Sequence, residues 1–333
     1  MRGNVDGRAM VWRNAVPTPT THKTPHRAVA LSEPGTMTRV TEPTRYGDGV
    51  AVVVVTYFPG DDLARFLDTL EKATTRDVRV VLADNSADPA SDAAVHNAAL
   101  DSAAERDGVQ LLRIGENLGY GGGANRGVAE LDESYGWVVV ANPDLEWEPG
   151  SLDVLLEATH RWPRGGAFGP LIREPDGTVY PSARLLPSLG RGVGHAVFGK
   201  VWPANPWTRA YRQERAPEER TSGWLSGSCQ LFRREAFDSV NGFDSRYFMY
   251  FEDVDLGDRI GRAGWQNVYV PSAAVTHIGG KATARAPKKM LAAHHESAYR
   301  YLADRHRGPA WRPVLAAIKL GLAVRLKLET RDR

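Results

Sequence analysis

Residues 136–144 read GWVVVANPD, an apolar run that ends at Asn142, Pro143 and the carboxylate of Asp144. An uninterrupted apolar run of this kind is typical of a strand that is buried on both faces. Taken alone, an acid behind such a strand is most simply a strand cap or a turn residue. The rest of the chain supports a second interpretation, in which Asp144 belongs to a functional site.

Three similar apolar runs precede this stretch and alternate with helical patterns. The runs cover residues 50–58, 78–84 and 109–114, and the helical stretches cover 61–73, 88–106 and 115–131, the last after a glycine-rich turn. The first helix shows the i, i+3, i+4, i+7 spacing of an amphipathic helix, with Leu63, Phe66, Leu67 and Leu70. This alternation of predicted strands and helices over residues 50–160 predicts an α/β fold with a mostly parallel sheet flanked by helices.

Polar residues mark the ends of the predicted strands. In parallel α/β sheets, ligands bind beyond the carboxyl ends of the strands. Thr56, Asp84, Asn117 and Asp144 all fall at such ends. We therefore expect these four side chains to gather at one edge of the sheet, where a ligand binds.

The composition limits the class of protein. The chain has 333 residues, a net charge of +2 and one cysteine, Cys229. The charge gives little support for nucleic-acid binding, and a single cysteine excludes a disulfide framework and a metal site built on a cysteine cluster. No segment approaches the roughly 20 apolar residues of a membrane-spanning helix. The first 30 residues lack the apolar region of a signal peptide.

Three regions are expected along the chain. Residues 1–48 are rich in Pro, Thr, Arg and Gly without a hydrophobic period, which predicts disorder. Residues 49–285 hold the α/β domain, although the alternation loosens past residue 165. The later parts of that domain predict loops over 173–222, a strand within 223–237, a helix within 248–264 and a short strand within 267–280. Residues 286–333 predict two helices, at 288–305 and 313–328.

The last of these helices has two interpretations. Its apolar residues alternate with the basic residues Arg312, Lys319, Arg325 and Lys327. It either packs on the core or lies on an anionic membrane surface as a basic amphipathic helix.

The glycine-rich stretch GYGGGA, residues 119–124, matches the G-x-G-x-x-G/A fingerprint of dinucleotide-binding proteins, and Asp144 lies about 20 residues downstream. A nicotinamide- or flavin-dependent oxidoreductase is therefore one alternative, and a merely flexible loop is another. Two features count against the oxidoreductase. The match falls at the third strand–helix unit, and the turn GENLG separates the glycines from the strand.

Two further motifs carry ionisable side chains. In FEDVDL, residues 251–256, Glu252 and Asp253 fall at the start of a predicted helix, where carboxylates act as ordinary N-terminal caps. Alternatively, adjacent acids raise each other's pKa, as a general base requires. His277, in VTHIGG, is either a structural histidine or a ligand for a metal or a phosphate.

Several of these stretches occur together in one known family. They are VVVVTYFPGDDLARFLDTL, VVLADNS, NLGYGGGANRGV, WVVVANPDLEWEPGSL, GWLSGSCQLFRREAF, NGFDSRYFMYFEDVDLGDRIGRAGW and AVTHIGG. In this order, over residues 50–280, they resemble the inverting family-2 glycosyltransferases. Within that family the chain is similar to bacterial rhamnosyltransferases, and among these to actinobacterial enzymes that transfer rhamnose from dTDP-rhamnose to a prenyl-diphosphate-linked GlcNAc.

The resemblance implies a GT-A fold, in which a nucleotide-binding, mostly parallel sheet is joined to an acceptor-binding region. Asp84 is then expected to accept a hydrogen bond from the imide N–H of the nucleobase. Asp144 is the expected metal ligand, with Asn142 in place of the first acid of the family's D-x-D motif. The other residues implied in binding the nucleotide, its diphosphate or the sugars are Thr56, Tyr57, Asn85, Asn117, Gly119, Asn125, Gly227 and Glu252.

The same resemblance implies a mechanism and a location. His277 is expected as a second ligand of a divalent cation, Mn²⁺ or Mg²⁺, and Asp253 as the catalytic base of a single displacement with inversion. The implied acceptor is a lipid-linked glycan in cell-envelope synthesis. We therefore expect a cytoplasmic enzyme on the inner face of the cell membrane, held by its last helix. A catalytically inactive sugar-nucleotide-binding protein is a third alternative.

Overall fold

The computed structural model describes residues 45–86, 93–188, 217–279 and 287–331. These residues belong to one compact unit. The disorder expected for residues 1–48 lies almost wholly outside the described residues, as do residues 88–92 of the second predicted helix.

The first half of the central sheet is the parallel arrangement that the sequence predicts. It contains β1 (Gly49–Thr56), β2 (Val78–Asp84), β3 (Val109–Arg113) and β4 (Tyr135–Ala141), in the order β3-β2-β1-β4. Every pair among them is parallel. The sequence of β1 is apolar throughout because the strand is covered on both faces, and its residues from Val50 onward are buried.

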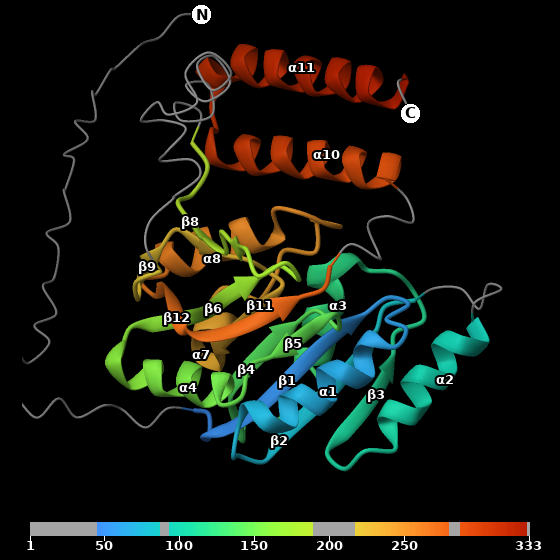
Figure 1. Ribbon diagram of the computed structural model, residues 1–333. Helices are drawn as coiled ribbons and strands as arrows, with labels where there is room; N and C mark the ends of the chain where they lie inside the picture. The colour runs from blue at the N-terminus through green and yellow to red at the C-terminus, as the bar shows by residue number, and fades with distance from the viewer. Residues whose placement is uncertain (1–44, 87–92, 189–216, 280–286, 332–333) are drawn as a thin grey trace, which may run out of the picture. The chain divides into compact units, whose positions relative to one another are not determined.

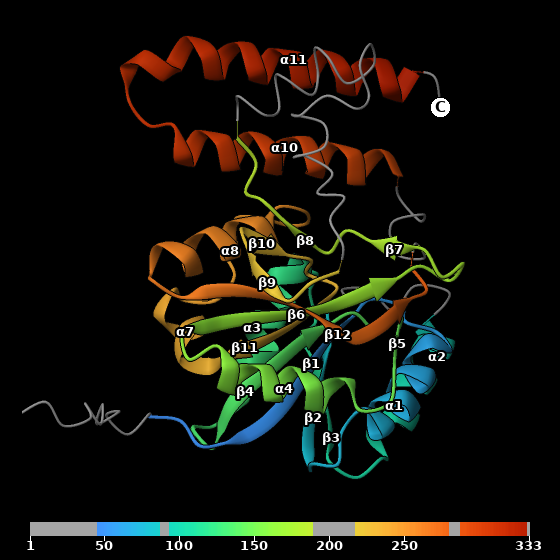
Figure 2. The ribbon, with the colours of Figure 1, turned by 60° about the vertical axis from the view of Figure 1, so that its left-hand side comes forward.

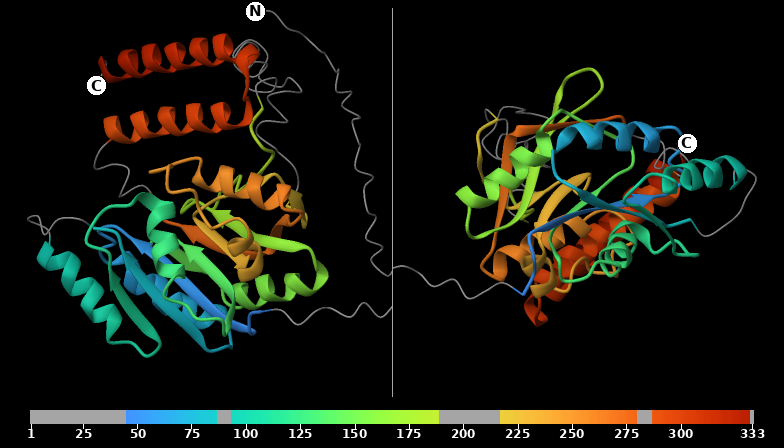
Figure 3. Two further views of the ribbon diagram at one scale, coloured as in Figure 1. Left: turned by 180° about the vertical axis from the view of Figure 1, so that it is seen from behind. Right: turned by 90° about the horizontal axis from the view of Figure 1, so that it is seen from below.

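Helices cover the two faces of this sheet with two separate cores. Val50, Val52 and Val54 of β1 pack on one side with α1 (Asp62–Ala73), α2 (Ala93–Ala104) and α4 (Ser151–Arg161). Ala51, Val53 and Val55 pack on the other side with α3 (Gly119–Val128), α7 (Arg234–Ser239) and α8 (Glu252–Arg262). The view from behind shows α3 and α7 on this second face (Figure 3).

The second half of the sheet is mixed, and sequence analysis missed much of it. β11 (Cys229–Arg233) runs antiparallel between β4 and β6 (Gly165–Arg173), followed by β12 (Gln266–His277) and β5 (Leu145–Trp147). The nine-residue β6 was not predicted, and the strand expected within 267–280 is not short, because β12 has 12 residues.

Glycines conceal β6 in the sequence. The strand reads GGAFGPLIR, and glycine and proline are ordinarily depleted in strands. The fold needs these glycines for close approach. A Cβ on Gly166 would stand 2.7 Å from the Cβ of Trp265, and one on Gly169 would stand 2.9 Å from a methyl group of Leu225.

Short strands also occur where loops were expected over residues 173–222. They are β7 (Val179–Tyr180), β8 (Ala183–Arg184) and β9 (Arg220–Ser222), and β8 pairs with β10 (Trp224–Leu225). Residues 189–216 of this region lie outside the described part of the chain.

The two C-terminal helices are those that the sequence predicts, α10 (Pro287–Arg305) and α11 (Arg312–Arg331). α10 packs on the rest of the unit through Tyr301, which is buried with Tyr247 and Val254. α11 packs on α10, which lies between α11 and the sheet (Figure 1, Figure 2). None of the helices in the described residues combines the length and the apolar character that a membrane crossing needs.

Candidate active site

A cleft of about 680 Å³ lies beyond the carboxyl ends of β1, β2 and β4. α10 and the loop that leads into α8 also line it. It brings together most of the residues predicted from sequence, namely Tyr57, Asn85, Asn117, Gly119, Asn142, Asp144, Gly227, Glu252, Asp253 and His277. The expectation that strand ends define a ligand site therefore agrees with the geometry.

One end of the cleft is built around the amide of Asn85, just after β2. Its Nδ2 donates to the carbonyl oxygen of Gly119 at 2.9 Å and to Oδ1 of Asn117 at 3.2 Å, and its Oδ1 accepts from the N–H of Leu118 at 2.9 Å. Asn85 thereby fixes the turn that enters α3. Gly119 has a φ of +76°, and a Cβ there would overlap the carbonyl of Phe248.

The glycines that follow serve helix–sheet packing. A Cβ on Gly123 would stand 2.9 Å from a methyl group of Val55, and one on Gly127 would overlap Val53. Both glycines lie within α3, so the stretch is neither a flexible loop nor a turn directly at a strand end. The glycine-rich motif brings α3 close to β1.

Three predicted residues do not line the cleft. Thr56 is fully buried, and Asp84 is buried in an ion pair of 3.4 Å with Arg113. Asn125 holds the backbone of Phe243, donating to its carbonyl oxygen at 2.8 Å and accepting from its N–H at 2.9 Å. The geometry thus gives Asn125 a structural contact in place of the expected position beside the nucleotide.

Asp144 and His277 meet because two strands pair. β5 begins directly after Asp144 and lies antiparallel to the end of β12, with Leu145 opposite His277. The His277 Nε2 atom lies 3.2 Å from Oδ1 of Asp144 and 3.3 Å from Nδ2 of Asn142. The pairing of β5 with β12 therefore brings together residues that are far apart in the sequence.

Asp144 and His277 can hold a divalent cation only together with further ligands. Within the described residues, no group of three or more His, Cys, Asp or Glu side chains could hold a metal. Both Mn²⁺ and Mg²⁺ accept carboxylate oxygen, Mn²⁺ also accepts imidazole nitrogen, and Mg²⁺ ordinarily completes its shell with water and substrate phosphates. One carboxylate and one imidazole fit such a cation if a diphosphate binds beside them.

A strained turn positions the carboxylates of α8. Tyr250 and Phe251, directly before the helix, have φ values of +65° and +64°. Two consecutive aromatic residues in the left-handed region are rare, and such strain concentrates at functional sites. The turn brings Asp253 to Gly227, whose N–H donates to Oδ2 of Asp253 at 2.9 Å.

Glu252 and Asp253 lie in different surroundings. Burial raises the pKa of Glu252 well above its usual range, and the neighbouring charge of Asp253 raises it further. One carboxyl oxygen of Glu252, Oε2, is buried and has no hydrogen-bond partner among the described residues. Burial also raises the pKa of Asp253, but hydrogen bonds from the N–H groups of Gly227 and Val254 oppose the increase. Environments that separate two carboxyl pKa values are typical of acid–base chemistry.

Many side chains of the cleft were not predicted from the sequence, among them Tyr120, Arg184, Lys289 and His294. Tyr120 donates its hydroxyl to the carbonyl oxygen of Gly227, and burial raises its pKa far above the usual range. Arg184 comes from β8, and Lys289 and His294 come from α10. Tyr120 lies inside the glycine-rich motif and could have been singled out. No sequence signal connects β8 or α10 with the cleft.

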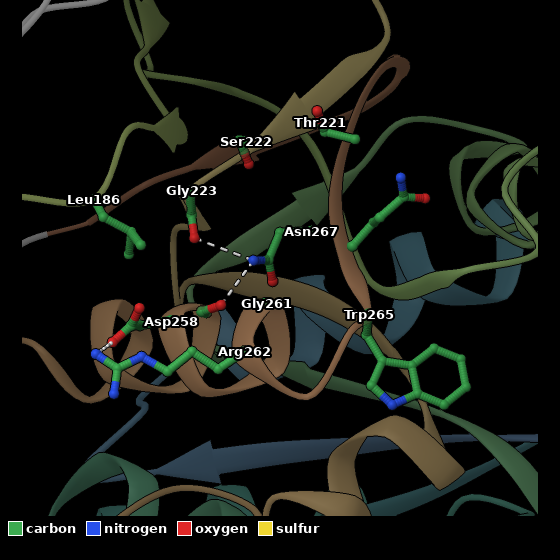
Figure 4. A pocket seen from close by; sticks show the side chains of 11 residues that line it. Leu186, Thr221, Ser222, Gly223, Asp258, Gly261, Arg262, Trp265 and Asn267 are labelled. Carbon is green, nitrogen blue, oxygen red and sulfur yellow. Dashed lines mark hydrogen bonds and ion pairs between the residues drawn. The ribbon is translucent and has the colours of Figure 1, made fainter.

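A second, shallower pocket of about 340 Å³ lies further along α8 (Figure 4). Several of its polar side chains form ion pairs or hydrogen bonds. Asp258 forms ion pairs with Arg262 at 2.8 Å and Arg305 at 2.6 Å, and Asn267 donates to the carbonyl oxygens of Gly223 and Gly257. These bonds tie α8 to its neighbours, so we assign the pocket a structural role.

Comparison with known proteins places these features in a family. Residues 51–240 match the sequence model of Glycosyl transferase family 2, and residues 207–294 match that of Glycosyltransferase like family 2. An N-acetylglucosaminyl-diphospho-decaprenol L-rhamnosyltransferase of Mycobacterium tuberculosis H37Rv is 56% identical over 297 residues, which cover 86% of this chain and 94% of that protein.

Two more distant proteins share parts of this pattern. The rhamnosyltransferase WbbL of Escherichia coli K12 is 28% identical over 56% of this chain and 70% of that protein. The solved mannosyltransferase PcManGT of Pyrobaculum calidifontis, in complex with GDP-Man and Mn²⁺, superimposes with a TM-score of 0.53 at 16% identity. That superposition covers 82% of this chain and 70% of the mannosyltransferase, and it concerns the fold alone.

Proposed function

The chain belongs to glycosyltransferase family 2, and on that basis we propose that it transfers L-rhamnose from dTDP-rhamnose to a GlcNAc-diphospho-prenol acceptor, with inversion. Its fold is the GT-A fold. The observation that carries the proposal is the 56% identity, over nearly the whole length of both chains, to a transferase whose name states this sugar and this acceptor. The family match favours a glycosyltransferase over the oxidoreductase alternative.

Asp253 is the catalytic base of the proposed reaction. The N–H of Gly227 orients its carboxylate toward the cleft, and the strained turn before α8 fixes its position. In the proposed step, Asp253 removes the proton from the acceptor hydroxyl as that oxygen attacks the anomeric carbon. The nucleoside diphosphate leaves from the opposite face, so one displacement inverts the configuration. Burial raises the pKa of Glu252 to about 8, whereas the backbone N–H groups of Gly227 and Val254 favour the charged form of Asp253.

The donor occupies the other end of the cleft in this proposal. Tyr57, Asn85 and Asn117 contact the nucleoside and its diphosphate. Asp84 does not line the cleft, so its contact with the base imide stays a prediction from the family resemblance. Asp144 and His277 hold a divalent cation, which supplies positive charge against the leaving diphosphate. The mannosyltransferase of related fold was solved with Mn²⁺, which agrees with this choice of ion.

α11 supports a membrane-surface location. Leu320 is 67% exposed and Val324 is 50% exposed, although both are apolar. The basic residues Lys319 and Arg325 are exposed on the same helix. Each basic residue near an anionic membrane contributes about 1 kcal/mol of binding. We propose that α11 lies on the inner leaflet, where a lipid-linked acceptor is presented.

The direct test uses purified protein, a short-chain GlcNAc-diphospho-prenol and a panel of dTDP-, UDP- and GDP-sugars. Of these donors, we expect only dTDP-rhamnose to give nucleotide release and a glycosylated lipid. EDTA should abolish transfer, and Mn²⁺ or Mg²⁺ should restore it. Transfer from a different donor would keep the enzyme class and refute the rhamnose assignment. Nucleotide binding without transfer from any donor would favour an inactive binding protein.

A further inference from the structure

More acidic than basic side chains line the cleft. The acidic ones are Asp62, Asp144, Glu252 and Asp253. Arg184 and Lys289 are the permanently cationic side chains among the described residues that line it. The function proposed above brings two diphosphates into this cleft, one on the donor and one on the acceptor. The cation proposed at Asp144 and His277 neutralises charge on the donor diphosphate. No partner has yet been assigned to the diphosphate of the acceptor.

Arg184 is held beside the catalytic base. Its Nε donates to the carbonyl oxygen of Pro181 at 2.7 Å, and its guanidinium group lies 5.2 Å from the ring centre of Tyr180 and 5.5 Å from that of Trp224. Arg184 pairs across the strands with Trp224, which lies just before Gly227, the residue whose N–H donates to Asp253. Arg184 is therefore on the acceptor side of the cleft, where a proton is removed, and its charge opposes part of the rise that burial causes in the pKa of Asp253.

Lys289 reaches the cleft from α10. Its Nζ atom lies 5.8 Å from the ring centre of Phe248, at the start of the loop that carries Tyr250 and Phe251. α10 is fixed on this loop, because the hydroxyl of Ser297 donates to the carbonyl oxygen of Met249 at 2.9 Å. The lysine itself is exposed, so it can meet a ligand at the mouth of the cleft.

The neighbours of the two cations are apolar. Leu185 and Pro187 line the cleft next to Arg184 in sequence, and Met290 lines it next to Lys289. Leu185 is 43% exposed. A donor diphosphate lies between two polar groups, a nucleoside and a sugar. The diphosphate of a lipid-linked acceptor is followed directly by hydrocarbon, which matches cations flanked by apolar side chains.

We propose that Arg184 and Lys289 bind the diphosphate of the acceptor, and that Leu185 and Met290 contact the first isoprene units behind it. This inference rests on the function proposed above. Hydrogen bonds from guanidinium and ammonium groups to phosphate oxygens are about twice as strong as neutral ones. The site makes the diphosphate itself a determinant of acceptor choice.

The test compares two acceptors that differ in charge. One is a farnesyl-diphosphate-linked GlcNAc, and the other is an uncharged octyl glycoside of GlcNAc. Lys289→Gln and Arg184→Gln should each lower kcat/KM for the charged acceptor by at least about tenfold. For Lys289→Gln, activity with the uncharged acceptor and the KM for dTDP-rhamnose should change less than about twofold. Lys288→Gln, a neutralisation of the adjacent lysine, which does not line the cleft, is the matched control.

A binding measurement separates this inference from the proposed function. Farnesyl diphosphate carries no acceptor sugar, so its affinity can be titrated even if no transfer occurs. Wild type and Lys288→Gln should bind it, and Lys289→Gln should bind it at least about tenfold more weakly. Equal binding by all three proteins would overturn the inference. A raised KM for the donor would assign the two cations to the donor diphosphate instead. Absence of transfer by wild type, with farnesyl diphosphate still bound through Lys289, would refute the proposed function alone.

Discussion

Glu252 and Asp253 are adjacent in the chain, and burial raises the pKa of both, but their hydrogen-bond partners differ. Asp253 accepts hydrogen bonds from two backbone N–H groups, whereas the buried Oε2 of Glu252 accepts none among the described residues. Sequence analysis identified both acids because they start a predicted helix. The local pattern did not distinguish their roles, which came from the family resemblance, because the difference arises from the turn at Tyr250 and Phe251 and from the distant Gly227.

Asp253→Asn should abolish transfer while the nucleotide still binds. The amide keeps the size of the side chain but cannot take the acceptor proton, and loss of such a base lowers the rate by about 10²–10⁴-fold. Single-turnover transfer and titration with dTDP measure the two properties separately. Turnover near the wild-type rate would remove Asp253 from the mechanism.

Glu252→Gln should have a contrasting effect, because glutamine resembles the neutral form of the acid. We expect transfer at pH 7 within about tenfold of wild type, far above that of Asp253→Asn.

The stability of wild type should depend on pH through Glu252. A raised pKa in the folded state stabilises the protein below the unfolded-state value of about 4.3, and that contribution is lost as the pH rises through the folded-state pKa.

Thermal unfolding of Glu252→Gln and wild type at pH 5 and pH 8 tests this assignment. The Tm of the variant should rise relative to that of wild type between the two pH values, because wild type loses about 1.4 kcal/mol of stability for each pH unit over which only the folded state keeps the proton. A Tm difference that stays constant or shrinks with pH would contradict a neutral Glu252.

At the scale of secondary-structure elements, the sequence specifies the parallel half of the sheet better than the mixed half. β1 and β4 are recognisable because strands covered on both faces are apolar throughout. β6 is hidden by glycines that the packing of Trp265 and Leu225 requires. α10 was predicted as a helix, but helical periodicity does not tell which surface the helix covers, so Lys289 and His294 were missed.

The turn into α3 allows a test of close packing. Gly115→Ala and Gly119→Ala both place a Cβ in the left-handed region, but only the second would overlap another residue, Phe248. The backbone conformation alone costs about 1–2 kcal/mol in each variant. The overlap should add about 1–3 kcal/mol for Gly119→Ala. Thermal unfolding should therefore rank wild type above Gly115→Ala and Gly115→Ala well above Gly119→Ala, and equal Tm values for the two variants would show that Phe248 yields without cost.

The exposed face of α11 allows a test of membrane association. The double change Leu320→Glu and Val324→Glu should reduce binding to phosphatidylglycerol vesicles by more than about tenfold, because it replaces apolar contact with negative charge. Both residues are at least half exposed, so the Tm should change little. Val179→Glu, at a valine of β7 that is also 50% exposed, is the matched control for added charge. Flotation of the double variant with vesicles to the wild-type extent would contradict the proposed role of α11.

At the scale of the whole molecule, the cleft joins residues from both halves of the sheet and from α10. Asn117 and Asp144 follow from the rule that ligands bind at the carboxyl ends of parallel strands, whereas Thr56 and Asp84, predicted by the same rule, do not line the cleft. His277 reaches Asp144 only through the antiparallel pairing of β12 with β5, which the sequence pattern does not indicate. Arg184 depends on β8, a two-residue strand in a region that reads as loop. Family resemblance supplied the roles that local patterns could not.

The central claim is that one displacement, assisted by Asp253, moves rhamnose onto a lipid-linked GlcNAc. The most direct measurement is an NMR determination of the anomeric configuration in the glycolipid that wild type forms from dTDP-rhamnose and GlcNAc-diphospho-farnesol. The mechanism predicts a rhamnosyl–GlcNAc linkage whose anomeric configuration is opposite to that of the donor. A product with the donor's configuration would contradict the single displacement, and a product without rhamnose would contradict the assigned reaction.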